Sequence, residues 1–75
     1  MKVNSLAANQ TEITKSNGDQ VFVSYSTPVA AIIGGLSYKT DRKYSATTTR
    51  HVNAWLGNGG VNAISKPQDF FDNLI

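Results

Sequence analysis

The residues with the greatest chemical potential in this sequence are gathered in the stretch 44–56. It contains the only histidine (His51), the only tryptophan (Trp55) and Arg50, and three threonines precede them at positions 47–49. A histidine can act as a base that activates a nearby hydroxyl group as a nucleophile, but a catalytic triad also needs an acid that orients the base. No Gly-x-Ser-x-Gly motif is present, and threonines before a helix commonly serve as caps. We therefore expect no catalytic residue and no enzymatic activity.

His51 and Trp55 are four residues apart, so on a helix they lie side by side. One interpretation makes them a stacking or hydrogen-bonding platform beside Arg50. The other buries Trp55 in the core and leaves His51 at the margin with one satisfied hydrogen bond. We favour the second, because so short a helix needs the tryptophan for burial.

Composition argues against a cofactor or a metal centre. The chain has no cysteine, and its single histidine stands among five scattered acids. The glycine-rich stretches 34–35 and 57–60 match neither a phosphate-binding loop nor a dinucleotide fingerprint. We expect no cofactor and no bound metal.

Basic residues cluster in the middle of the chain. Within the twelve residues 39–50, four cations are opposed only by Asp41, although the net charge is just +2. A solvated turn is the commoner explanation of such a cluster, yet it could also steer an anionic partner. Interleaved aromatics, Tyr38, Tyr44 and Trp55, leave a single-stranded nucleic-acid binder open as the alternative. The residues expected to bind a partner are Lys39, Arg42, Lys43, Arg50 and His51.

Alternating apolar residues and turn signals predict a small antiparallel sheet. The strands expected are 11–16, 20–26, 28–33 and 36–40. Asn17-Gly18 favours a type I′ hairpin turn, and Gly34-Gly35 favours a second tight turn. Pro28 marks a bend, a bulge or an edge position. Residues 1–10 form either a loose arm or an added edge strand.

Two helices are expected after the sheet. The first spans Thr48–Leu56, capped by Thr47 or Thr48, with Val52, Trp55 and Leu56 facing the core and Gly57 ending it. The second is short and follows Ser65 and Gln68, which have capping-box spacing. Its apolar face must dock on the domain or on a second chain, so a homo-oligomer could form there. The residues of that face are Phe70, Phe71, Leu74 and Ile75.

Together these elements predict one α+β domain over residues 1–75. A three- or four-stranded meander packs against one main helix, with the short helix at the end. At this length a domain buries only about 60% of its surface, so its core is small. The core residues expected are Val21, Val23, Ile32, Leu36, Tyr38, Val52, Trp55 and Leu56, with Phe70 and Phe71 at one end.

Two strings of the sequence resemble a known family. They are Ser24-Tyr25-Ser26-Thr27-Pro28-Val29-Ala30 and Lys43-Tyr44-Ser45-x-Thr47-Thr48-x-Arg50-His51-Val52-Asn53-x-Trp55-Leu56. They resemble small uncharacterised proteins encoded mainly by bacteriophages, prophages and plasmids, over residues 20–57. Residues 1–10 and 65–75 lie outside the matched pattern. The resemblance implies a phage or mobile-element origin but no activity, cofactor or catalytic residue.

The function expected is that of a small non-catalytic interaction protein. Its partner would be a host or phage macromolecule, with protein favoured over nucleic acid. The longest apolar run, Val29–Ile33, is too short for a membrane span, and no signal peptide is evident at the start. We therefore expect no membrane association and a location in the cytoplasm of the host cell.

Overall fold

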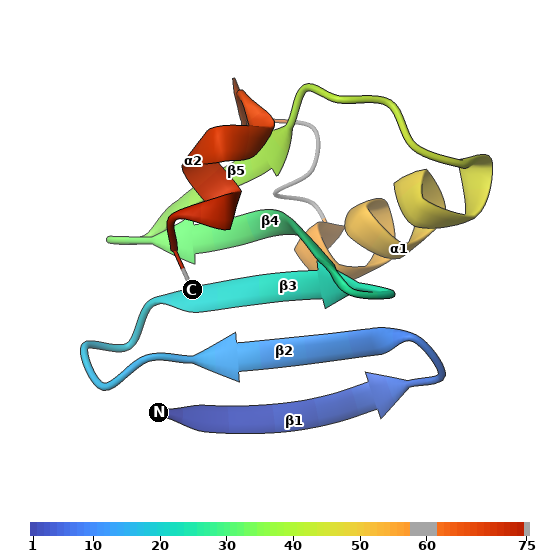
Figure 1. Ribbon diagram of the computed structural model, residues 1–75. Helices are drawn as coiled ribbons and strands as arrows, with labels where there is room; N and C mark the ends of the chain where they lie inside the picture. Colours follow the sequence, from blue (N-terminus) through green and yellow to red (C-terminus); the bar gives the residue numbers. More distant parts are fainter. Residues whose placement is uncertain (58–61, 75) are drawn as a thin grey trace.

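A computed structural model of the chain describes residues 1–57 and 62–74, and it contains one six-stranded sheet with two helices (Figure 1). The strands lie side by side in chain order, antiparallel except for the parallel pair β5 and β6. The α+β class and the meander are thus confirmed, but the sheet has six strands rather than the three or four predicted. The elements are β1 (Lys2–Ala7), β2 (Gln10–Thr14), β3 (Gln20–Ser24), β4 (Thr27–Ile33), β5 (Leu36–Thr40), α1 (Ala46–Leu56), β6 (Ile64–Lys66) and α2 (Gln68–Asp72).

The turns between strands follow glycine placement, with one correction. Gly34 and Gly35 both have positive φ, as the predicted tight turn requires. In the β2–β3 loop only Gly18 has positive φ, at 94°, and its N–H donates to the Lys15 carbonyl at 2.9 Å. The Lys15 N–H also donates to the Asp19 carbonyl at 2.8 Å. This is a three-residue loop with a left-handed glycine, so the predicted type I′ turn is wrong.

The first ten residues form the edge of the sheet. β1 pairs with β2 in an antiparallel register that places Val3 opposite Ile13. The following turn has Asn9 at φ 63°, and its carbonyl accepts a hydrogen bond of 2.7 Å from the Tyr25 N–H. The edge-strand alternative is therefore correct, and the turns that follow β1 and β3 are joined at one end of the sheet.

A bulge in β4 builds the core beneath α1. Phe22 lies opposite Ala30 and Val23 opposite Pro28, so Val29 has no partner on β3. Such a bulge turns two neighbouring side chains toward one face. Phe22, Val29 and Ala30 accordingly share a cluster with two residues of α1, Val52 and Leu56. The bulge is one of the outcomes that Pro28 predicted.

The other face of the sheet is covered by α2. Tyr38 lies opposite Ala31, which lies opposite Val21, so the three side chains share the face that Phe22 does not. The Tyr38 ring lies 5.3 Å from the ring of Phe70 on α2, and Phe71 is fully buried. Each face of the sheet thus has its own helix.

The core differs from the expected list at several positions. Phe22 is completely buried, whereas Leu36, expected in the core, is 53% exposed. Leu36 follows directly on the Gly34-Gly35 turn, so it stands at the end of the sheet rather than under a helix. The expected core residues that are only half-buried are Val23, Ile32, Tyr38, Trp55 and Phe70.

The first helix begins earlier than predicted. Its N-cap is Ser45, whose Oγ accepts from the Thr48 N–H at 3.2 Å, so the expected caps Thr47 and Thr48 are wrong. Thr48 instead lies in the first turn and is buried. The end is as predicted, because Gly57 has φ 59° and its N–H donates to the Asn53 carbonyl.

The second helix also starts differently. Its N-cap is Pro67, which makes no side-chain cap, and Ser65 belongs to β6. The predicted capping box of Ser65 and Gln68 is therefore wrong. Gln68 is buried, and its Nε2 donates to the Pro28 carbonyl at 2.7 Å and to Asp72 Oδ1 at 2.9 Å. Ile75 and residues 58–60 of the glycine-rich stretch lie outside the described residues.

β6 was not predicted, because three residues are too few to show a pattern. It pairs with β5 in parallel, with Lys39 opposite Ser65, and the Asp41 N–H extends the contact by donating to the Lys66 carbonyl at 2.9 Å. β6 thereby forms the edge of the sheet beside the basic residues. Neither described helix is long and apolar enough to cross a membrane.

Candidate functional site

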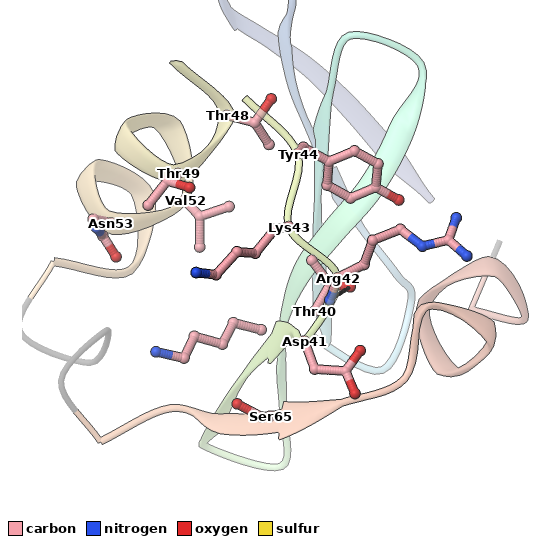
Figure 2. A pocket seen from close by; sticks show the side chains of 11 residues that line it. Thr40, Asp41, Arg42, Lys43, Tyr44, Thr48, Thr49, Val52, Asn53 and Ser65 are labelled. Atoms are coloured by element: carbon pink, nitrogen blue, oxygen red, sulfur yellow. Dashed lines mark hydrogen bonds between the residues drawn. The ribbon is translucent and has the colours of Figure 1, made fainter. Parts of the chain in front are cut away.

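Three of the predicted partner-binding residues meet in one hollow. Lys39, Arg42 and Lys43 line a hollow of about 360 Å³ bounded by the end of β5, the segment that follows it, β6 and α1 (Figure 2). The remaining lining residues are Thr40, Asp41, Tyr44, Thr48, Thr49, Val52, Asn53 and Ser65.

The sheet register and the segment after β5 place these cations. Lys39 lies opposite Ala30, whose side chain is in the core beneath α1, so Lys39 belongs to the α1 face. In Figure 2 the Lys43 side chain extends toward Val52 of α1, whereas Arg42 points away from that helix. The two lysines are therefore the principal charges on the α1 side of the hollow.

The segment that carries Arg42 is held by Thr40. The Thr40 Oγ1 accepts from the Arg42 N–H at 3.2 Å and donates to Gln68 Oε1 at 2.8 Å. Gln68, the first residue of α2, is buried and also donates to the Pro28 carbonyl of β4. The turn after β5 is therefore connected to β4 through Gln68. Lys66 lies nearby on β6, with its Nζ 5.6 Å from the centre of the Phe70 ring.

The chemistry available in the hollow is binding of an anionic group. Lys39 and Lys43 supply ammonium donors, and Ser65 and Asn53 add a hydroxyl and an amide. Asp41 is the one acid among the described lining residues. The hydroxyl of Thr49 donates to the Ser45 carbonyl within the helix start at 3.4 Å. The arrangement offers hydrogen bonds and positive charge without a paired nucleophile and base.

Arg50 and His51 do not line this hollow. Arg50 is exposed on α1 and donates to Thr47 Oγ1 at 3.5 Å. His51 is half-buried, with Nδ1 3.0 Å from Ser24 Oγ and its ring 6.2 Å from that of Tyr25. His51 thus makes a hydrogen bond at the core margin, as the sequence favoured. The structure divides the predicted set among three places: the hollow, the exposed side of α1 and the contact with Ser24.

A second hollow lies on the other flank of α1. The Trp55 ring stacks on Phe22 with centroids 5.1 Å apart, and its Nε1 donates to Glu12 Oε1 at 2.9 Å. Trp55 and Glu12 line a hollow of about 360 Å³ together with Leu6, Gln10, Gln20, Ile32 and Ala54. Glu12 was not predicted as a site residue, because a single acid in a predicted strand carries no signal and its partner is 43 residues away.

Metal binding has no support in the part of the chain that the structure describes. Within residues 1–57 and 62–74, no three histidine, cysteine or acidic side chains are gathered as a ligand set.

A family model matches residues 1–73, nearly the whole chain. The chain belongs to the family of unknown function DUF8033. The match includes β1 and residues 65–73, both outside the stretch 20–57 that carries the sequence resemblance. The residues that match DUF8033 therefore include the lining of both hollows. Because the family has no known function, the match assigns no activity to either hollow. No curated protein and no solved structure was found to match the chain.

Proposed function

We propose that this DUF8033 member is a small non-catalytic binding protein that contacts an anionic partner through the hollow lined by Lys39 and Lys43. The observation that carries the proposal is the placement of these two lysines, one on β5 and one on the following segment, in a single hollow beside α1. Like charges gathered in one place on a folded surface attract an oppositely charged partner and steer its approach.

An acidic protein segment fits this hollow better than a single-stranded nucleic acid. Single-strand binders stack successive bases on exposed aromatic rings. Here Tyr38 packs against Phe70 and Trp55 against Phe22, which leaves Tyr44, 38% exposed, as the aromatic residue at the hollow. One ring beside two lysines offers few stacking positions.

The proposed setting is the cytoplasm of a host cell, with a host or phage protein as partner. The resemblance of residues 20–57 to phage, prophage and plasmid proteins supports this origin. The C-terminal face does not favour a homodimer, because Phe71 is fully buried in its own chain and Phe70 packs on Tyr38. Of the residues expected there, Leu74 is half-buried.

The first test measures binding of a fluorescently labelled oligoglutamate peptide at about 50 mM salt, where screening is modest. Lys39→Ala and Lys43→Ala are each expected to weaken binding about two- to five-fold, which corresponds to one partly exposed ion pair. Arg50→Ala is the matched control, because it removes one cation from the same region without touching the hollow. Its affinity should equal that of the unaltered protein.

Two outcomes would reject the proposal. An equal loss in Arg50→Ala would show that the peptide responds to overall charge rather than to the hollow. Binding that is independent of both lysines would place the contact elsewhere. An oligothymidylate of the same charge, bound more tightly than the peptide and in a lysine-dependent manner, would favour the nucleic-acid alternative instead.

A further inference from the structure

The hollow beside Trp55 brings one aromatic residue and one carboxylate together. The Trp55 ring stacks on Phe22 at an interplanar angle of 17°, so one face of the indole is covered. Trp55 is only half-buried and lines the hollow, so part of its side chain remains accessible there. Glu12 lies in the same hollow, opposite Phe22 in the sheet register.

The carboxylate of Glu12 is only partly used by the protein. Its Oε1 accepts from Trp55 Nε1, and a carboxylate has a second oxygen with its own acceptor sites. Gln10 and Gln20 add amide groups to the lining, and Leu6 and Ile32 make it partly apolar. Among the described residues that line this hollow, none is basic.

A purely structural role does not require a charge at position 12. A neutral glutamine oxygen would also accept the Trp55 N–H, in a weaker hydrogen bond than the one a carboxylate accepts. The Glu12 side chain is half-buried, and its carboxylate is the one charged group among the described residues that line the hollow. The hollow therefore has the charge and the aromatic surface that a cationic side chain requires.

We propose that this hollow binds the guanidinium group of an arginine side chain from a partner protein. A planar guanidinium stacks on an indole face and at the same time donates to a carboxylate oxygen and to an amide oxygen. The inference is independent of the lysine-lined hollow, which takes the opposite charge on the other flank of α1.

Trp55 reports directly on this site, because it is the only tryptophan in the chain. The probe is the peptide acetyl-Gly-Arg-Gly-amide, compared with the same peptide containing citrulline, a neutral isostere of arginine. Binding is followed by Trp55 emission and by the indole N–H resonance. We expect a saturable change with the arginine peptide at roughly millimolar concentration, and at least about a five-fold weaker response with citrulline.

Glu12→Gln is the decisive variant, because it keeps an acceptor for Trp55 Nε1 and removes the charge. Its circular dichroism spectrum should be unchanged, while its response to the arginine peptide falls to that of citrulline. Lys43→Ala should bind the arginine peptide normally, which separates this test from that of the lysine-lined hollow. Equal responses to arginine and citrulline, a response retained in Glu12→Gln, or no saturable change in either signal would overturn the proposal.

Discussion

The two faces of the sheet each bury one phenylalanine completely, but their helices cover them differently. Phe22 lies under α1 and Phe71 joins α2 to the opposite face. α1 has eleven residues, contacts β3 and β4, and leaves hollows along both of its flanks. α2 has five residues and packs mainly on β4, where the buried Gln68 fixes it.

This difference implies that residues beside α1 can serve binding, whereas residues on the α2 face serve mainly stability. At the margins of α1, polar pairs join helix to sheet, Ser24 with His51 and Glu12 with Trp55, and the second pair also lines a hollow. At α2 the principal polar residue, Gln68, is enclosed by its own chain. Substitutions on the α2 face should therefore change mainly the free energy of unfolding, whereas those beside α1 can change binding alone.

The largest effect is expected from emptying the core on either face. Phe22→Ala and Phe71→Ala should each lower the free energy of unfolding by about 3–5 kcal/mol, measured by urea denaturation. Only Phe22→Ala should shift the Trp55 emission of the folded protein, because Phe22 is the ring on which Trp55 stacks. Leu36→Ala is the control, with a cost below about 0.5 kcal/mol at an exposed site. If both phenylalanine variants shift the emission equally, the two faces are not independent.

A smaller effect is expected at the polar anchor of α2. Gln68→Ala removes donors to the Pro28 carbonyl and to Asp72, so it should cost about 1–3 kcal/mol in thermal or urea unfolding. Thr40→Val removes the hydrogen bond from Thr40 to Gln68 and the exposed one that Thr40 accepts from the Arg42 N–H, and it should cost less. A Thr40→Val cost as large as that of Gln68→Ala would show that the β5 contact, not the β4 contact, holds α2.

The smallest effect is expected at the start of α1. Ser45→Ala removes the N-cap and should lower stability by about 1 kcal/mol, with a loss of helical circular dichroism. Thr47→Ala, at a position that the sequence also suggested as cap, should be nearly neutral. A larger loss in Thr47→Ala would mean that α1 starts at the threonines after all.

The sequence predicted the elements best where the signal is local. The structure agrees with three such signals: the alternation in residues 20–40, the Gly34-Gly35 turn and the helix end at Gly57. Each of them depends on residues that are close together in the sequence. The predicted N-cap was wrong because Ser45, Thr47 and Thr48 all carry a hydroxyl group that can cap a helix. Which of them caps the helix depends on the path that the backbone takes between β5 and α1.

The site was predictable only in part, for a similar reason. Lys39 and Lys43 are close in sequence and remain close in the fold. Arg50 is also close in sequence, but successive helical residues turn by about 100°, and it lies outside the hollow. The contact between Glu12 and Trp55 spans 43 residues, so no local pattern could announce it.

By itself, the sequence determined the α+β class, the order of the main strands, the core stripe of α1 and the existence of a basic cluster. These depend on periodicity and turn chemistry, which act between neighbouring residues. Three features were decided only by the tertiary structure. β6 bounds the lysine-lined hollow, and the β4 bulge buries Val29 beside Ala30. Glu12 accepts a hydrogen bond from Trp55. Those outcomes depend on contacts between distant segments, whose register is set only when the sheet and both helices pack together.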